Sequence, residues 1–150
     1  MASYPLGPAL EFLRRLWRLN HALEKLSSRM EKRLGVTAQQ RLILRCVGKY
    51  PGLTAGRLAG LLHVDPGTLS AALHRLESKG FLDRRRDPRD KRRASLGLTA
   101  KGRALDLPAT GSVEDAVERL LESASAEDLD SMVNIVDRLT GLLDEELDAE

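Results

Sequence analysis

Ten consecutive residues, RRRDPRDKRR at positions 84–93, form the densest cluster of charged side chains in this sequence. Seven of the ten are Arg or Lys, and Asp87 and Asp90 lie among them. Guanidinium and ammonium groups at this density favour phosphate binding, because a polyanion relieves their mutual repulsion. The alternative, a solvated basic turn, leaves that repulsion uncompensated. The run therefore predicts a surface that contacts a polyanion, with nucleic acid as the first candidate and an anionic membrane as the second.

Charge is distributed unevenly along the 150 residues, although the formal net charge is only +2. Residues 75–105 hold 11 basic and 4 acidic side chains, whereas residues 106–150 hold 2 basic and 14 acidic ones. This asymmetry predicts one surface that binds anions and a separate surface that repels them. Double-stranded DNA is therefore the partner that we expect for the basic segment.

Length and composition favour one folded domain in a reducing compartment. The chain is long enough for a substantial core, and 42% of its residues are apolar. Cys46 is the single cysteine, so an intrachain disulfide is impossible and a cytoplasmic location fits best. We see neither a signal peptide nor an apolar stretch near ~18 residues, and we therefore expect no membrane span.

Apolar residues recur every three or four positions in a series of helical patterns. The first pattern runs from Pro8 to Gly35 and is longer than a small monomeric domain needs. Such long terminal helices are typical of chains that pack against a partner subunit. The other helices are expected to begin after the capping residues Thr37, Thr54, Asp65, Thr99 and Ser125. The helix that begins after Thr99 is expected to be interrupted or bent near Pro108 and Gly111 and to resume over 112–124.

Residues 81–86 and 93–98 are typical of two short antiparallel strands, with an extended loop around Pro88 between them. Helix, short helix, capped helix and hairpin in this order predict a helix-turn-helix followed by a β-wing. The capped helix would lie in a major groove, and the basic hairpin would reach the neighbouring minor groove. The expected fold class is mainly α, a winged helix-turn-helix with long N- and C-terminal dimerisation helices.

The capped helix offers few long polar side chains for reading bases. Arg75 could pair with guanine, and Thr68 or Ser70 could bond a base or a phosphate. The alternative for Arg75 is a solvated side chain or a pair near Glu77. Because small residues carry little hydrogen-bond code, we expect DNA shape to supply much of the specificity. The predicted DNA-binding residues in this region are Thr54, Pro66, Gly67, Thr68, Ser70, Ala71, His74 and Arg75.

The stretch LHVDPGTLSAALHRLESKGFLDRRRDPRDKRRASLGLTAKG resembles the winged helix-turn-helix of the multiple-antibiotic-resistance regulators, the MarR family. Its most specific parts are Asp90-x-Arg92 in the wing and Leu98-Thr99-x-x-Gly102 at the start of the next helix. The resemblance extends over the whole chain in element order, and it implies a homodimeric transcription regulator. A single domain over 1–150 would then divide into dimerisation helices and a DNA-binding lobe. The implied ranges are 1–35 and 106–150 for dimerisation and 36–105 for the lobe.

The resemblance also implies roles for residues of the wing. Asp90 would orient an arginine, and Arg89, Lys91 and Arg92 would enter a minor groove, where a narrow A·T-rich duplex concentrates negative potential. Alternation along the strands should point only some of the other arginines at phosphate. These are Arg84, Arg85, Arg86 and Arg93, of which Arg86 joins the predicted DNA-binding set.

A small-ligand site between the dimer region and the DNA-binding lobe is a further implication of the resemblance. Trp17, Asn20 and His21 form a polar-aromatic cluster on the helix that would border this crevice, and Arg103 would be the cation for an anionic or aromatic effector. A core role for Trp17 and a structural role for His21 are the alternatives. Cys46 is expected to act as a small hydrophobe, with redox sensing as its alternative.

The combined prediction is a homodimeric, sequence-specific transcription regulator, namely a ligand-responsive repressor that binds a pseudo-palindromic operator. A non-specific architectural DNA-binding protein and a protein-interaction adaptor are the alternatives. We do not expect an enzyme, because the sequence has no phosphate-cradling glycine loop, nucleophile elbow or HExxH motif. No cofactor is expected, and no metal site either, because no Cys/His cluster has zinc spacing.

Overall fold

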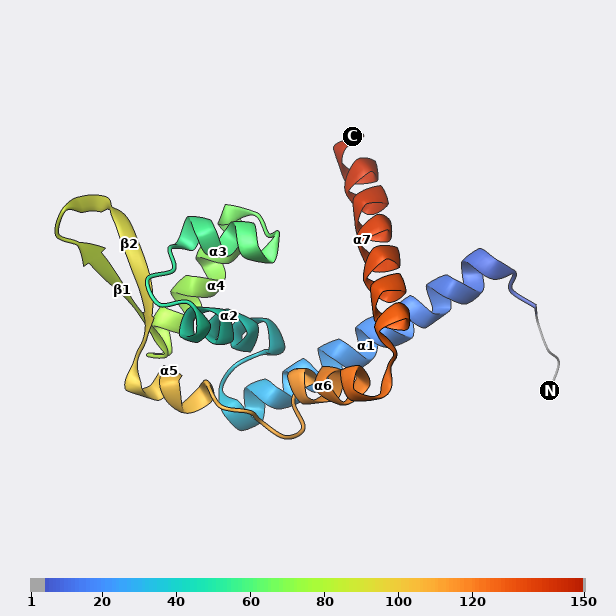
Figure 1. Ribbon diagram of the computed structural model, residues 1–150, viewed down its shortest axis with the longest axis horizontal. Helices are drawn as coiled ribbons and strands as arrows, with labels where there is room; N and C mark the ends of the chain where they lie inside the picture. The colour runs from blue at the N-terminus through green and yellow to red at the C-terminus, as the bar shows by residue number, and fades with distance from the viewer. Residues whose placement is uncertain (1–4, 150) are drawn as a thin grey trace. The chain divides into compact units, whose positions relative to one another are not determined.

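The computed structural model describes residues 5–149, and for Lys91 and Arg92 it describes only the backbone. Most of these residues lie in helices, accompanied by a two-stranded sheet, so the fold is mainly α as predicted (Figure 1). The elements, in chain order, are α1 (Pro8–Leu34), α2 (Ala38–Lys49), α3 (Ala55–Leu62), α4 (Pro66–Ser78), β1 (Leu82–Asp87), β2 (Asp90–Leu98), α5 (Ala100–Leu105), α6 (Val113–Ser123) and α7 (Ala126–Asp148).

The chain divides into two compact units, Met1–Val113 and Glu114–Glu150. The first unit contains α1 to α5 and the hairpin, and the second contains nearly all of α6 and the whole of α7. The basic run at 84–93 and helix α4 both belong to the first unit.

Side-chain caps fix where the helices begin. Thr37 Oγ1 accepts a hydrogen bond from the Gln40 amide at 3.2 Å, and Gln40 Oε1 accepts one from the Thr37 amide at 3.1 Å. This reciprocal pair is the capping box that satisfies two amides at the start of α2. The other predicted caps are confirmed, and each accepts from the amide three residues later: Thr54, Asp65, Thr99 and Ser125.

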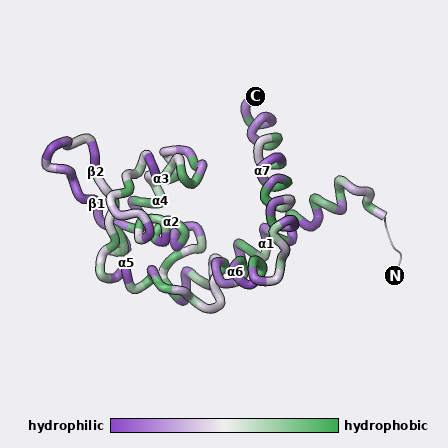
Figure 2. The backbone as a smooth tube through the Cα atoms, in the orientation of Figure 1, coloured by the Kyte–Doolittle hydropathy of each residue, from purple (hydrophilic) through white to green (hydrophobic). Residues whose placement is uncertain are grey.

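The core of the first unit lies between α2, α3, α4 and the base of the hairpin. Leu44, Leu58, Leu73 and Leu76 are 0% exposed there. Figure 2 shows hydrophobic backbone positions along α2 and α4 and hydrophilic ones at the tip of the hairpin. Removing this aliphatic surface from water is worth roughly 25 cal/mol per Å², and it fixes α4 against the rest of the lobe.

Two large apolar side chains of α2 and α3 are exposed. Leu42 on α2 is 52% exposed, and Leu61 on α3 is 47% exposed. Leu42, Ile43 and Leu44 are consecutive, and three successive residues cannot all face one side of a helix with 3.6 residues per turn, so Leu42 faces outward.

The hairpin is longer and its turn is tighter than the sequence predicted. Leu82 pairs with Leu98 and Arg86 with Ala94, and after a register shift Asp87 pairs with Asp90. The expected extended loop from 87 to 92 is therefore wrong, because Asp87 pairs with Asp90 and β2 already begins at Asp90. Asp87 Oδ1 accepts a hydrogen bond from the Arg89 amide at 2.8 Å and closes the short turn.

The base of the hairpin is joined directly to the start of α3. The Leu96 amide donates to the Leu53 carbonyl at 2.7 Å, and Thr54 forms an isolated antiparallel bridge with Ser95. Since Thr54 also caps α3, these contacts fix the position of the wing relative to that helix.

Candidate nucleic-acid interface

Helix α4 presents a face of small and polar residues to solvent. Its opposite side is formed by Leu69, Leu73 and Leu76, which are at most 3% exposed. This spacing turns the rest of the helix outward. The residues that the sequence placed on the outer face are all exposed: Pro66, Gly67, Thr68, Ser70, Ala71, His74 and Arg75.

The first turn of α4 is organised by Asp65 and Thr68. The Thr68 amide donates to Asp65 Oδ1 at 2.9 Å, and the Thr68 hydroxyl donates to the same carboxylate. These bonds lower the pKa of the Asp65 carboxyl, the Thr68 hydroxyl contributing most and its amide next. Because the Thr68 hydroxyl donates its hydrogen to Asp65, its oxygen is left to accept, which suits the amino groups of cytosine or adenine.

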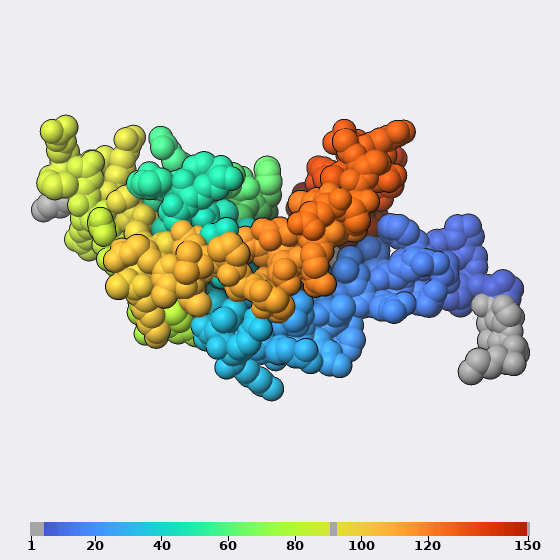
Figure 3. All heavy atoms as spheres, turned by 60° about the horizontal axis from the view of Figure 1, so that its bottom comes forward, coloured from blue at the N-terminus to red at the C-terminus, as the bar shows by residue number. Residues whose placement is uncertain are grey.

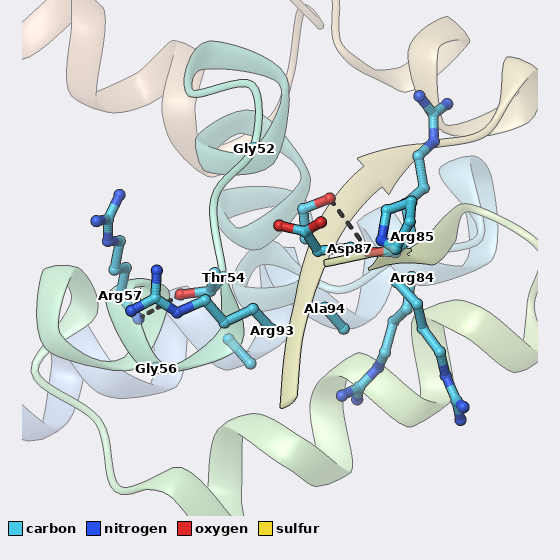
Figure 4. Close-up of a pocket in the computed structure, with 13 residues that line it drawn as sticks. Gly52, Thr54, Gly56, Arg57, Arg84, Arg85, Asp87, Arg93 and Ala94 are labelled. Carbon is cyan, nitrogen blue, oxygen red and sulfur yellow. Dashed lines mark hydrogen bonds between the residues drawn. The ribbon is translucent and has the colours of Figure 1, made fainter. Parts of the chain in front are cut away.

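Arginine side chains alternate between the two sides of β1. Figure 4 shows Arg84 and Arg85 pointing to opposite sides, as the two-residue period of a strand requires. Arg84 forms an ion pair with Glu77 of α4, and Arg85 Nε lies 3.7 Å from Asp83 Oδ1. Glu77 therefore engages the wing, whereas Arg75 is exposed on the outer face of α4.

A groove of about 870 Å³ lies between the hairpin and the start of α3 (Figure 4). Gly52, Thr54 and Gly56 form its small-residue wall, so the first turn of α3 is accessible. Backbone amides at a helix start and clustered guanidinium groups both favour an anion. The charged lining residues are one acid, Asp87, and five arginines: Arg57, Arg84, Arg85, Arg86 and Arg93.

Arg57 belongs to this groove although it was not among the residues predicted from the sequence. It lies in the first turn of α3, is exposed, and its amide donates to Thr54 Oγ1 at 3.3 Å. Its position three residues after the predicted cap Thr54 could have identified it, because the first turn of a capped helix favours an anion.

The tip of the hairpin carries the other predicted wing residues. Arg86 and Arg89 are exposed, and Asp90 Oδ2 lies 3.8 Å from Arg93 Nε. The side chains of Lys91 and Arg92 lie outside the described residues. In Figure 3 the hairpin projects beside α3 at the edge of the lobe, and so its tip is open to a partner.

The residues predicted to bind a small ligand lie on two different elements. Trp17, Asn20 and His21 share one exposed face of α1, where Trp17 is 65% exposed and Asn20 donates to Glu24 at 3.2 Å. Arg103 lies on α5 and donates to the Leu98 carbonyl at 3.0 Å. The groove beside the wing is lined by other residues, so a ligand role for these four stays a prediction.

Cys46 is half-buried beside the core. Burial raises the pKa of its thiol, and the nearby Lys49 only partly opposes this. The thiol form, which is the less reactive one, is therefore favoured at neutral pH. Across residues 5–149, no three His, Cys, Asp or Glu side chains gather as a metal site would require. Of the helices in the same range, none has the length and apolarity needed to cross a membrane.

Helices α2 to α4 followed by the hairpin β1–β2 define a winged helix-turn-helix protein. The profile of the MarR family matches residues 36–94, which contain all of these elements except the end of β2. The chain is also 32% identical over 111 residues to the HTH-type transcriptional repressor Mb2911 of Mycobacterium bovis, covering 74% of this chain and 80% of the relative. The chain belongs to the MarR family.

Other relatives and solved structures agree with this assignment. The HTH-type transcriptional regulator TtmR of Methylorubrum extorquens is 33% identical over 73% of this chain, and the match spans 54% of its own length. The chain spans between 54% and 65% of three such curated relatives. A structure of the S. aureus MepR–DNA complex superposes with a TM-score of 0.71 at 26% identity, covering 91% of this chain and 99% of MepR.

One structural relative was solved with a small molecule. The PcaV transcriptional regulator of Streptomyces coelicolor, in complex with its natural ligand, superposes with a TM-score of 0.69 at 26% identity. The superposition covers 94% of this chain and 98% of PcaV.

Proposed function

We propose that this chain is a homodimeric, sequence-specific regulator of transcription, a ligand-responsive repressor that binds a pseudo-palindromic DNA operator. The observation that carries the proposal is the groove in which five arginines surround the accessible start of α3, next to the exposed face of α4. A duplex is the ligand that would contact a helix face and a basic hairpin together. The DNA present in the MepR structure supports this choice of partner.

Each part of this surface has a distinct proposed task. Helix α4 would lie in the major groove, with Arg75 and His74 as its longest side chains toward base edges. Arg57 and Thr54 would contact phosphate at the start of α3. The wing tip would enter the adjacent minor groove through Arg89, Lys91 and Arg92, and Arg86 on β1 would contact phosphate.

The terminal helices would join two copies of the chain. In this proposal residues 1–35 and 106–150 dimerise, and residues 36–105 form the DNA-binding lobe. Large apolar side chains support it, because they are exposed on α1, α6 and α7, and such patches mark interaction surfaces. Examples are Leu10, Phe12, Leu120, Val136, Leu142 and Leu143, which are between 46% and 58% exposed.

An effector would act on this dimer in a cytoplasmic setting. The ligand bound to PcaV supports a search for one. The candidate residues are Trp17, Asn20 and His21 on α1, with Arg103 on α5 as the cation for an anionic or aromatic molecule. The proposal includes no enzymatic activity, cofactor or metal.

Competition binding tests the proposal. The labelled duplex is the region upstream of the protein's own gene, and the competitor is random duplex of equal length. We expect specific binding by the wild type, and a loss of about tenfold or more for Arg89→Ala, because a minor-groove arginine contributes roughly 1–3 kcal/mol. Lys49→Ala removes one positive charge from an exposed position of α2 that lies outside both the proposed DNA contacts and the dimerisation helices, and it should bind like the wild type.

Two outcomes that differ from the expected one would each indicate a different function. Equal affinity for both duplexes would contradict sequence-specific recognition and indicate an architectural DNA-binding protein. An intact dimer that binds neither duplex would contradict the DNA interface and indicate a protein-interaction adaptor.

A further inference from the structure

The end of α4 is tied to the long N-terminal helix by one side chain, Lys79. Lys79 is the C-cap of α4, and its ammonium group extends to the end of α1. Its Nζ donates to the Gly35 carbonyl at 3.0 Å and to Gln40 Oε1 at 3.1 Å, and it lies 3.4 Å from Glu31 Oε1. These three partners are far from Lys79 in sequence, so the contact joins separate elements.

Two of these partners hold the ammonium group in a fixed position. Gln40 is only 7% exposed, and the oxygen that meets Lys79 also accepts from the Thr37 amide in the capping box. Gly35 caps the C-terminus of α1, where the helix dipole favours a cation. The pair with Glu31 is half exposed, and exposed pairs contribute little stability. The contact therefore matters for geometry more than for stability.

The backbone of Lys79 joins a fourth helix to the same point. Its carbonyl accepts a hydrogen bond from Lys101 Nζ at 2.8 Å, and its amide donates to the Arg75 carbonyl at 3.0 Å. The ends of α1 and α4 and the starts of α2 and α5 therefore meet around this residue.

We propose that Lys79 is a positioning residue that fixes the angle between α4 and α1 and thereby sets the half-site spacing that the protein accepts. The inference rests on the proposed function, in which α1 belongs to the dimer interface. A helix of 13 residues is about 20 Å long. A tilt of about 10° at the Lys79 end displaces its first turn by about 3 Å, which is one base-pair step along DNA. Loss of the contact would therefore change spacing more than base preference.

Selection from a random duplex library tests this inference with full-length protein. The wild type is compared with Lys79→Met, which keeps the aliphatic stem and removes the amine, and with Lys79→Gln, whose amide is too short for the same reach. Lys79→Arg retains a charged donor. Lys49→Met removes an equal charge from an exposed position of the lobe. Circular dichroism melting confirms that every variant is folded.

We expect the wild type, Lys79→Arg and Lys49→Met to enrich a single half-site spacing. Lys79→Met and Lys79→Gln should enrich the same half-site sequence at two or more spacings. Their affinity for the wild-type duplex should fall about tenfold, the size of one poorly placed base pair. Enrichment of one unchanged spacing by both variants would overturn the inference while leaving DNA recognition intact. Failure of the wild type to enrich any duplex would overturn the proposed function, and the inference with it.

Discussion

At the scale of single residues, Gly102 has the tightest structural requirement among the glycines of residues 36–105. It is buried at the start of α5, and a Cβ at this position would overlap the Phe81 carbonyl oxygen. The Thr99 amide donates to that same oxygen at 3.2 Å. The glycine in the Leu98-Thr99-x-x-Gly102 motif is therefore explained by the close approach of two backbone segments.

We expect Gly102→Ala to lower the free energy of unfolding by about 3 kcal/mol, because the new methyl group must displace backbone rather than a side chain. Gly60→Ala is the matched control. Gly60 lies in α3, and a methyl group added there would meet no neighbouring side chain or element within 4 Å, so alanine should raise stability by about 0.5–1 kcal/mol. Urea unfolding of both variants measures the difference. Equal stability of Gly102→Ala and the wild type would contradict the packing.

The Asp65–Thr68 pair predicts a dependence on pH. Thr68→Val removes the hydroxyl that contributes most to lowering the Asp65 pKa, so this pKa should rise toward its ordinary value. The hydrogen bond from the backbone amide of residue 68 should preserve part of the shift. The pKa of Asp65 is lower in the folded than in the unfolded protein. The stability that the Asp65 carboxylate contributes is therefore present above its unfolded pKa of about 3.9, and it is lost as the pH falls through its folded pKa.

Nuclear magnetic resonance titration of the Asp65 carboxyl measures this pKa. Ser70→Ala, an exposed position on the same helix, is the control and should leave the pKa unchanged. The stability difference between wild type and Thr68→Val that depends on this carboxylate should vanish in strong acid. An Asp65 pKa that is the same in Thr68→Val as in the wild type would contradict the assigned cause.

At the scale of elements, local sequence signals were sufficient for the helices and insufficient for the wing. The caps at Thr37, Thr54 and Asp65 fixed the helix starts because each cap is satisfied within four residues of chain. The outer face of α4 followed from the spacing of its leucines. The length of β2 could not be predicted in this way. Backbone pairing holds the two charged segments together, and it leaves no periodic pattern in the side chains.

The site was harder to predict where residues distant in sequence meet. Lys79 contacts Gly35 and Gln40 across 44 and 39 positions, respectively. Glu77 pairs with Arg84 only because β1 turns back along α4. Neither contact leaves a pattern in the neighbouring sequence. The sequence therefore predicted which residues of the site are exposed, but it did not predict which side chains form hydrogen bonds or ion pairs with one another.

The Glu77–Arg84 pair makes a prediction about the wing. Glu77→Gln removes an acid beside the interface and releases Arg84, which can then contact one more phosphate. The salt slope for random duplex, the change of log affinity with log salt, should steepen by about one per lobe. Asp144→Asn in α7 removes an equal charge from the second unit and should leave the slope unchanged. A slope in Glu77→Gln equal to that of the wild type would show that Arg84 gains no phosphate contact.

At the scale of the whole molecule, basic and acidic residues are separated along the chain, and apolar side chains stay exposed on the terminal helices. Leu143 and Val136 of α7 are 56% and 55% exposed, respectively. A dimer interface would cover exposed apolar side chains of this kind. One chain has a mass of 16.6 kDa. The oligomeric state therefore bears directly on the proposed function.

We expect sedimentation equilibrium to give twice the chain mass for the wild type and a weaker dimer for Leu143→Glu, because the new carboxylate would have to be desolvated at the interface. Asp137→Asn, a polar replacement on the same helix, should leave dimerisation intact. A wild type that sediments at the mass of one chain would contradict the assignment of the terminal helices.

The most direct test of the central claim, that the wing and α4 form a DNA interface, is the salt dependence of duplex binding. If the dimer makes roughly eight phosphate contacts, affinity should fall by about 10³ or more between 50 and 200 mM salt. Replacing Arg57 and Arg86 together by alanine removes two phosphate contacts per lobe. The slope of log affinity against log salt should therefore become shallower by about two per lobe. A wild-type slope near zero would contradict the interface, because no surface built on these arginines could bind DNA without releasing counterions.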